Sequence, residues 1–202
     1  MKKSLSILLI TSYLFAGSYE NGIEFYKKAQ YKKAFESFKI ATNNLDSKAM
    51  LALSTMYANG DGVDKNLEKS IFWLKRSADL NNMIACYRLG EYYASKENFK
   101  DAFKWFEKAA LDGNSKAQYN LGYFYTGGLG VDRDLKKSLQ WYEKAATAGN
   151  IDAQLNLGFM YIGGHGTKVD YKKAAYWIGK AKQTGSTKAQ IMWDEFKLGD
   201  YK

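Results

Sequence analysis

Apolar residues recur at helical spacing along most of the chain. In residues 116–146, Ala117, Leu121 and Phe124 follow one another at intervals of three or four positions, which places them on one face of an α-helix. A glycine-rich stretch and a second helical pattern come after them. The segment therefore predicts two antiparallel helices joined by a glycine turn.

The two-helix pattern is repeated along the sequence. Blocks 48–78, 116–146 and 152–182 align without gaps over most of their length, and blocks 18–42 and 84–110 match a shorter form. An alanine recurs at spacings of 36, 32, 36 and 36 residues, at Ala49, Ala85, Ala117, Ala153 and Ala189. A tryptophan recurs at spacings of 32, 36 and 36 residues, at Trp73, Trp105, Trp141 and Trp177. The agreement between the two spacings predicts an all-α stack of helix-pair repeats.

Five repeats and a terminal cap account for this spacing. The predicted repeats span about residues 17–48, 49–84, 85–116, 117–152 and 153–188. Residues 189–202 begin like another first helix, but Trp193 and Asp194 stand where a Leu-Gly pair is expected. That departure predicts a C-terminal capping helix, because no further repeat has to pack on it.

Small residues mark the places where the two helices of a pair must approach closely. On the first helices they are Gly22, Ser54, Gly90, Gly122 and Gly158, and the large residues expected to fill the space on the second helices are Phe38, Leu74, Phe106, Tyr142 and Ile178. Small residues beside large ones are what two packed helices require. This pattern predicts tight packing within every repeat.

Glycine and asparagine supply the predicted turns and helix ends. Gly113, Gly149 and Gly185 follow the second helices, where a left-handed residue can end a helix. Asn114 and Asn150 then stand where a side chain can cap the next helix. The loop of the fifth repeat departs from the others, because residues 167–170 read Thr-Lys-Val-Asp, and we expect it to be shifted.

The first 18 residues have the features of a cleaved export signal. Lys2 and Lys3 precede an apolar run over residues 5–15, and Ala-Gly-Ser follows at 16–18. The run is too short to span a membrane, which takes about 20 residues, and no later segment is longer. We therefore expect residues 19–202 to be a soluble repeat domain in the periplasm or outside the cell.

The chain is basic, with a formal charge of +9. Removal of Lys2 and Lys3 would leave 28 basic and 21 acidic residues, a charge of +7, which favours acidic partners or anionic surfaces. The lysines are dispersed along the helices, however, and a solvated face explains them better. We expect no nucleic-acid partner, and we expect a monomer. Cys86, the single cysteine, is expected to be a small buried side chain.

The residues offer little for catalysis or for metal binding. His165 is the single histidine and no second cysteine is present, so neither a metal cluster nor a histidine-based triad is expected. The glycine loops have no preceding strand pattern and no Gly-Lys-Ser/Thr after them, so they are interpreted as structural turns rather than phosphate-binding loops. We therefore expect no catalytic residue, no metal and no cofactor.

The repeat resembles a known family. The fourth block reads Ala117-x3-Leu121-Gly122-x2-Tyr125, and Gly-x-Gly-Val, Asp, Ser-x2-Trp and Ala-Ala come after it. This pattern is similar to the Sel1-like repeat, and the shorter blocks look more like tetratricopeptide repeats. The resemblance covers about residues 17–190. It implies a right-handed α/α superhelical solenoid of five helix pairs plus a C-terminal capping helix.

The resemblance also implies where a partner would bind. In tetratricopeptide relatives the first helices line a concave surface that holds extended peptides. The matching residues here include Tyr87, Arg88, Tyr119, Asn120, Tyr123, Asn156 and Phe159. The asparagines could bond the main chain of a peptide, and the aromatic rings could supply contact area. Alternatively, the tyrosines pack between repeats and the asparagines bond a neighbour.

We thus expect a non-catalytic scaffold that binds a protein or peptide. An enzymatic alternative comes from a resemblance to exported Sel1-repeat proteins of the Helicobacter cysteine-rich family, which implies β-lactam binding or hydrolysis. The chain lacks the cysteine pair that those proteins carry in each repeat, and it has no Ser-x-x-Lys and no Lys-Thr-Gly. The residues therefore favour the scaffold.

Overall fold

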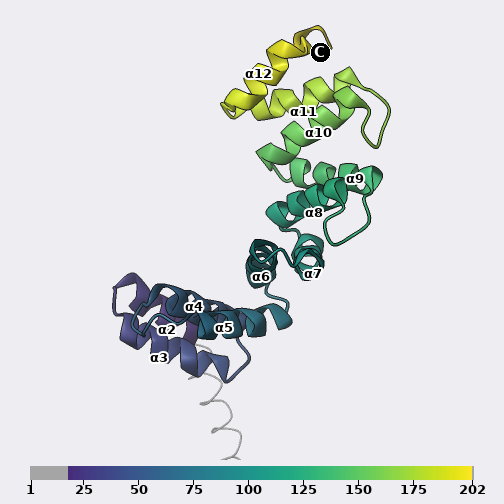
Figure 1. Ribbon diagram of the computed structural model, residues 1–202. Helices are drawn as coiled ribbons and strands as arrows, with labels where there is room; N and C mark the ends of the chain where they lie inside the picture. Colours follow the sequence, from purple (N-terminus) through teal and green to yellow (C-terminus); the bar gives the residue numbers. More distant parts are fainter. Residues whose placement is uncertain (1–17, 202) are drawn as a thin grey trace, which may run out of the picture. The chain divides into compact units, whose positions relative to one another are not determined.

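The computed structural model describes residues 18–201 and is helical (Figure 1). The predicted export signal lies outside the described residues except for Ser18, which begins the first helix of the described range. The chain divides into two compact units, one up to Leu89 and the other from Gly90. We describe each unit by itself.

The described part of the first unit, from Ser18, contains four helices and the beginning of a fifth. They are α2 (Ser18–Lys27), α3 (Tyr31–Thr42), α4 (Ser47–Asn59), α5 (Leu67–Asp79) and the first half of α6 (Met83–Ser95). Consecutive helices pack in pairs, α2 with α3 and α4 with α5. Phe38, Leu53 and Met56 lie at the centre of its core and are at most 1% exposed.

The second unit contains the rest of α6 and the helices that follow. They are α7 (Phe99–Leu111), α8 (Ser115–Gly127), α9 (Leu135–Thr147), α10 (Ile151–Gly163), α11 (Tyr171–Gln183), α12 (Thr187–Glu195) and the 3₁₀ helix η1 (Leu198–Tyr201). Residues 18–201 contain no strand. The predicted all-α fold of five helix pairs and a terminal capping helix is confirmed.

The small residues on the first helices lie against large side chains, as predicted. A Cβ atom at Gly122 would come within 2.6 Å of Cδ1 of Tyr142, and one at Gly90 would come equally close to Cδ1 of Phe106. A larger side chain at either glycine would therefore push the paired helices apart. In the first unit, Ser54 holds this place and its hydroxyl bonds that of Ser70 at 3.2 Å.

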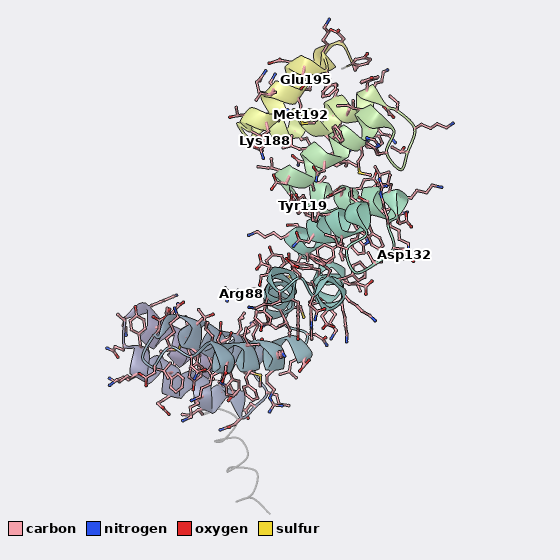
Figure 2. All side chains as sticks on the ribbon, in the orientation of Figure 1. Arg88, Tyr119, Asp132, Lys188, Met192 and Glu195 are labelled. Atoms are coloured by element: carbon pink, nitrogen blue, oxygen red, sulfur yellow. The ribbon has the colours of Figure 1, made fainter. Side chains whose placement is uncertain are left out.

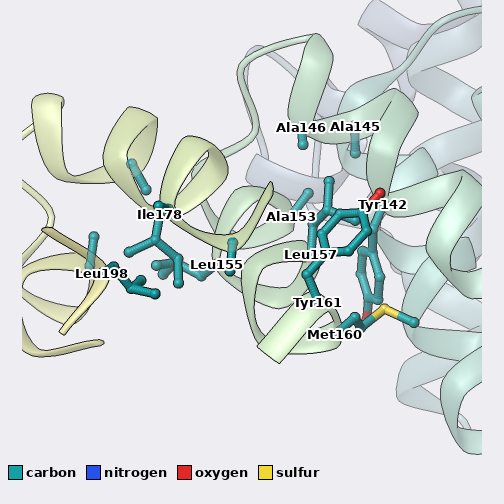
Figure 3. Close-up of a cluster of buried hydrophobic side chains, with 14 residues drawn as sticks. Tyr142, Ala145, Ala146, Ala153, Leu155, Leu157, Met160, Tyr161, Ile178 and Leu198 are labelled. Carbon is teal, nitrogen blue, oxygen red and sulfur yellow. The ribbon is translucent and has the colours of Figure 1, made fainter. Parts of the chain in front are cut away.

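The core of the second unit continues from one repeat to the next (Figure 3). Tyr142, Leu157 and Ile178 are at most 3% exposed and come from α9, α10 and α11. Leu198 of η1 is fully buried at the C-terminal end of this cluster. The final helices therefore cover an apolar surface that a further repeat would otherwise bury.

The helix ends have the residues that their geometry requires. Asn114 and Asn150 each accept a backbone N–H bond at 2.9 Å, from Ala117 and Ala153. Left-handed backbone follows the second helices at Gly113, Gly149 and Gly185, with φ of 91°, 86° and 84°. The predicted caps and turns are therefore present.

One loop prediction was wrong. The loop of the fifth repeat is not shifted, because Asp170 N–H donates to the Tyr161 carbonyl at 2.9 Å, as Asp134 N–H does to the Tyr125 carbonyl at 3.0 Å. Gly166, with φ of 71°, provides the left-handed turn that Gly130 provides in the fourth repeat. The backbone bond and the glycine thus fix the loop, and the intervening side chains can vary.

The residue after three of the anchor alanines, at Ala85, Ala117 and Ala153, bonds a carbonyl near the end of the preceding helix. Gln118 and Gln154 each donate a side-chain N–H bond to the carbonyl eight residues earlier, at 3.1 and 3.2 Å. Cys86 occupies the equivalent place, is 2% exposed, and its Sγ lies 3.5 Å from the Ala78 carbonyl. The cysteine is thus a small buried side chain, as expected.

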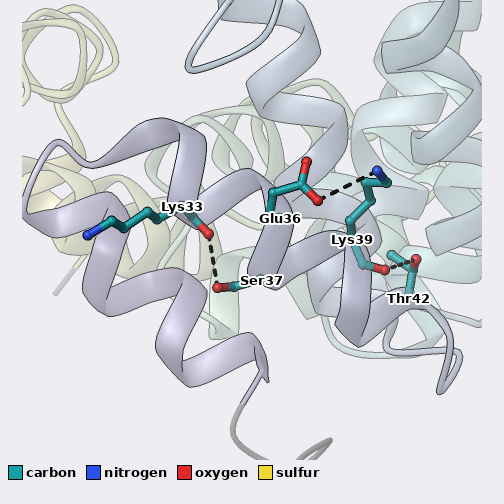
Figure 4. A network of polar contacts seen from close by, with 5 residues as sticks. All are labelled: Lys33, Glu36, Ser37, Lys39 and Thr42. Atoms are coloured by element: carbon teal, nitrogen blue, oxygen red, sulfur yellow. Dashed lines mark hydrogen bonds and ion pairs between the residues drawn. The ribbon is translucent and has the colours of Figure 1, made fainter.

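The outer surfaces of the helices are mainly polar. On α3, Ser37 Oγ donates to the Lys33 carbonyl at 2.9 Å, and Lys39 lies 3.6 Å from Glu36 (Figure 4). Such exposed contacts add little stability. No helix among the described residues is long and apolar enough to cross a membrane.

Candidate partner-binding groove

The second unit contains a hollow of about 430 Å³ between α8, α9 and α10. It is lined by Tyr119, Tyr123, Thr126, Arg133, Leu135, Tyr142, Asn156, Phe159, Met160 and His165. We call this hollow and its lining the aromatic groove. Its volume is in the range of ligand pockets in proteins, roughly 300–1,000 Å³.

Two successive first helices form the walls of the aromatic groove. Tyr119 and Tyr123 lie one turn apart on α8, and Figure 2 labels Tyr119 on that helix. Phe159 and Asn156 come from α10. Tyr123 and Phe159 are 52% and 51% exposed, so both present ring surface to solvent. Exposed aromatic rings are frequent anchors in protein interfaces.

Tyr142 of α9 forms part of the lining and is 3% exposed. Its ring lies against Gly122, and the centroid of the Tyr119 ring is 5.7 Å away. Burial raises the pKa of Tyr142 to about 12, although hydrogen bonds with Thr126 and Asn156 act in the opposite direction. The phenol is therefore neutral at physiological pH and remains a hydrogen-bonding group.

Tyr119 has a similar electrostatic environment. Its pKa is raised, first by burial and then by the charge of Asp152, while a hydrogen bond with Asn156 lowers it. Asn156 thus interacts with both buried Tyr142 and half-buried Tyr119. An amide held in this way can bond main-chain groups of a ligand without introducing a charge.

The loops add one cation and one imidazole ring. Arg133 Nε donates to the Thr126 carbonyl at 3.1 Å, which holds the guanidinium at the edge of the groove. The His165 ring stacks on Phe159, with the centroids 5.5 Å apart. None of the ten described lining residues carries a carboxylate. The groove therefore suits an apolar or aromatic group with a neutral or acidic neighbour.

The residues around the groove do not form a recognisable catalytic or metal site. Within residues 18–201, no group of three or more His, Cys, Asp or Glu side chains is placed to hold a metal ion. His165 faces an aromatic ring rather than a serine or cysteine nucleophile. For contact with a partner, these side chains offer ring faces, the amide of Asn156 and the cation of Arg133.

Four of the seven predicted groove residues line the hollow, namely Tyr119, Tyr123, Asn156 and Phe159. Asn120 lies on α8 and is half-buried, but it does not line the hollow. Tyr87 and Arg88 belong to the first unit. There, Arg88, labelled in Figure 2, donates to Thr55 Oγ1 at 3.0 Å. A binding role for any of the seven remains a prediction.

Sequence reasoning missed six lining residues: Thr126, Arg133, Leu135, Tyr142, Met160 and His165. Arg133 and His165 belong to loops, and Tyr142 was expected only as packing against Gly122. The glycine loop after each first helix was a usable signal, because the loop returns the chain to the second helix beside the same surface. Counting groove positions on the first helices alone could not reveal these residues.

Comparison with solved structures supports the repeat fold. The chain matches a Sel1 repeat protein from Oxalobacter formigenes with a TM-score of 0.74 and 32% identity, over 86% of this chain and 74% of that one. It matches c5321, a protective antigen of uropathogenic Escherichia coli, with a TM-score of 0.83 and 29% identity, over 94% and 41%. It matches Helicobacter pylori cysteine rich protein B with a TM-score of 0.52 and 31% identity, over 63% of this chain and 95% of that one.

Curated relatives are larger proteins. The chain is 33% identical over 91 residues to the chitin synthase regulator SKT5 of Saccharomyces cerevisiae, which is 42% of this chain and 13% of the relative. It is 29% identical over 126 residues to HRD3 of Candida glabrata, an ERAD-associated E3 ubiquitin-protein ligase component. That match covers 61% of this chain and 14% of the relative. The chain thus spans only a small part of these relatives.

The family model named Sel1 repeat matches four stretches of the chain. They are residues 47–82, 84–114, 115–150 and 151–186, which together make up more than half of the sequence. Each stretch corresponds to one of the observed helix pairs from α4 to α11. The chain therefore belongs to the Sel1 repeat family.

Proposed function

We propose that this protein is a non-catalytic scaffold that holds an extended segment of a partner protein in the aromatic groove. The observation that carries the proposal is the open hollow beside exposed Tyr123 and Phe159. Asn156 in its lining interacts with Tyr119 and Tyr142. Rigid aromatic side chains bury large areas on binding and lose little conformational entropy. This combination supports binding rather than chemistry.

The relatives support the same general role. HRD3 is by name a component of a ligase, and SKT5 is by name a regulator of another enzyme. Both descriptions concern proteins that act together with other proteins. The partner of the present chain is proposed to be a peptide segment with a large apolar or aromatic side chain for the hollow. A neutral or acidic flank is expected, because Arg133 lies at the edge.

Selection of peptides on the purified protein tests the proposal. A displayed library of random peptides is selected on the immobilised protein, and enriched peptides are measured by fluorescence anisotropy. Enriched sequences are expected to share an aromatic or large aliphatic residue. Tyr123→Ser combined with Asn156→Ala should weaken their binding by about 30-fold or more, since interface hot spots contribute about 2 kcal/mol or more.

A matched control distinguishes binding in the groove from nonspecific binding to exposed aromatic side chains. Tyr176 on α11 is 55% exposed, close to the 52% of Tyr123, but does not line the hollow. Tyr176→Ser should leave peptide affinity unchanged. The proposal is wrong if no peptide is enriched, or if the groove double variant binds as tightly as the parent while its helical circular dichroism is native.

We also propose that the protein acts outside the cytoplasm, on the basis of the signal-like residues 1–18. Mass spectrometry of the intact protein recovered from producing cells should give a chain that begins after Ser18. Recovery of the uncleaved chain from the cytoplasm alone would contradict export. Turnover of a chromogenic β-lactam by the purified protein would in turn favour the enzymatic alternative over the scaffold.

A further inference from the structure

The positive charge of the second unit is concentrated on its second helices. Helices α7, α9 and α11 together carry ten lysines, three acidic residues and no arginine, a net charge of +7. The intervening first helices α8, α10 and α12 carry two lysines and three acidic residues, a net charge of −1. The lysines of this unit are therefore concentrated on its second helices.

Six of these lysines occupy repeated positions. The second residue of each second helix is Lys100, Lys136 or Lys172, and the tenth residue is Lys108, Lys144 or Lys180. Eight residues of α-helix correspond to about 12 Å along the helix axis. Equivalent positions of stacked repeats face the same side. The six residues therefore form two rows of lysines across the three helices, and we call this surface the lysine face.

Few carboxylates balance the positive charge of the lysine face. None of the six lysines makes an ion pair with a described residue of the chain. Of the three acidic residues, Asp101 accepts a bond from Asn98 at 2.8 Å, and Glu143 accepts one from the Tyr161 hydroxyl at 2.7 Å. The lysine ammonium groups consequently project a positive field into solvent.

One row of lysines covers a row of tryptophan rings. The ammonium nitrogen lies 4.6, 4.1 and 5.2 Å from the ring centroid in the pairs Lys108–Trp105, Lys144–Trp141 and Lys180–Trp177. A lysine can bury its aliphatic stem on an apolar surface while its charge remains in water. Tryptophan combined with lysine is the composition found where proteins meet the headgroups of a bilayer.

A small hollow lies at the C-terminal end of the lysine face. Its volume is about 360 Å³, and its lining includes Lys172, Tyr176, Trp193 and Tyr201. Tyr176 is 55% exposed. Amphipathic rings beside an ammonium group can accommodate the polar and apolar parts of a lipid headgroup region.

We propose that the lysine face binds the surface of an anionic phospholipid bilayer. Arginine is preferred where a protein reads a carboxylate or phosphate with two bonds, and these three helices contain none. Lysine is also depleted in protein–protein interfaces. Single-stranded nucleic acid would need stacking platforms, whereas here lysines cover the tryptophan rings. A bilayer requires only a positive field and interfacial aromatic side chains.

Co-sedimentation with vesicles tests the proposal. The purified protein is mixed with vesicles of phosphatidylcholine, or with vesicles in which part of it is replaced by phosphatidylglycerol. Binding is expected only to the anionic vesicles. It should weaken as salt is raised, because the Debye length falls from about 10 Å at 0.1 M to about 3 Å at 1 M ionic strength.

Three substitutions locate the binding surface. Each lysine near an anionic membrane contributes roughly fivefold to binding, so K108Q/K144Q/K180Q should reduce vesicle affinity by about 100-fold. The control, Lys116→Gln with Lys188→Gln, removes two charges from α8 and α12, outside the lysine face, and should change affinity by less than about tenfold. Native helical circular dichroism of both variants excludes a folding defect.

Several outcomes would overturn the proposal. They are equal binding to neutral and anionic vesicles, no vesicle binding, and undiminished binding by the folded triple variant. Binding to duplex DNA or to an acidic polypeptide without binding to vesicles would assign the lysine face to another partner and would also reject it. The peptide-binding proposal is tested separately, because the six lysines do not line the aromatic groove.

Discussion

Residues 49–89 of the first unit and 117–157 of the second correspond at a constant offset of 68 positions, yet their inner surfaces differ. In the first unit, Arg88 donates a hydrogen bond to Thr55 Oγ1 at 3.0 Å. The equivalent residues of the second unit, Asn156 and Tyr123, line an open hollow. The same backbone thus presents two different surfaces.

The positions that shape the backbone change much less than those that line the surface. Leu53 and Leu121 are equivalent, and both are fully buried. Gly60 and Gly128 both end their helices in left-handed conformation. The comparison teaches that the repeat preserves a frame, while a few exposed side chains determine whether a partner site exists.

The largest expected effect is on the shared frame. Leu53→Ala and Leu121→Ala should each lower the free energy of unfolding by about 2–5 kcal/mol, because each leaves a cavity in a tightly packed core. Denaturant unfolding followed by circular dichroism measures the loss. A change below about 1 kcal/mol in only one of the two variants would show that the frames are not equivalent.

A smaller effect is expected when the surface of the first unit is transplanted into the second. Tyr123→Thr with Asn156→Arg should weaken the binding of groove-selected peptides by about 30-fold or more, because it removes an aromatic anchor and adds a competing charge. Fluorescence anisotropy gives the affinity. The control, Thr55→Tyr with Arg88→Asn in the first unit, should leave peptide affinity unchanged. Equal losses in both variants would contradict the assignment to the second unit.

Alkaline pH should destabilise the second unit through Tyr142, by less than the two effects above. Tyr142 has Leu74 as its counterpart, which cannot titrate. The pKa of folded Tyr142 is raised to about 12 from its ordinary value of 10. Its contribution to stability is therefore complete below pH 10 and is lost as pH rises from 10 towards 12, at a cost of about 1–2 kcal/mol.

Unfolding measured at several alkaline pH values tests this effect. The parent should lose stability across that interval, and Tyr142→Phe should lose less, because its ring has no ionisable proton. Ultraviolet absorbance of tyrosinate reports the ionisation itself. If the parent and Tyr142→Phe show the same slope of stability against pH, Tyr142 is not the group responsible.

The smallest effect concerns the turns after the second helices. Leu45 and Asn81 have φ of 58°, whereas their counterparts Gly113 and Gly149 are glycines with positive φ. Leu45 is 64% exposed, so its replacement removes no buried side chain. Leu45→Gly should therefore stabilise the protein by about 0.5–1 kcal/mol, since glycine adopts this conformation without steric cost. Thermal unfolding measures the change, and a loss of stability would contradict it.

Much of the fold could be predicted because it follows from local patterns that repeat. The 36-residue spacing, the pairing of Gly122 with Tyr142 and the asparagine caps each report a requirement of one repeat. The prediction for the loop at residues 167–170 was wrong, because the backbone bond from Asp170 N–H to the Tyr161 carbonyl fixes this loop whatever side chains precede it. Backbone requirements leave only indirect signals in a sequence.

The candidate site could be predicted only in part. Tyr119, Tyr123, Asn156 and Phe159 were found because they lie on first helices at regular positions. Arg133 and His165 were missed as groove residues, since their approach to the hollow depends on how the loops fold back. Asn120 was included because it stands two positions before Gly122, as Asn156 stands before Gly158. Only Asn156 lines the hollow, which lies between α8, α9 and α10.

The sequence by itself determined the all-α repeat, its helix pairs and its turns, because apolar period, small residues and glycines act within one repeat at a time. Only the tertiary structure decided which side chains from different helices share a surface. It joined Arg88 to Thr55 in the first unit and left a hollow beside Tyr123 in the second. The lysine face inferred above likewise depends on how α7, α9 and α11 stack. Such surfaces arise from distances between repeats, which the order of residues along the chain does not contain.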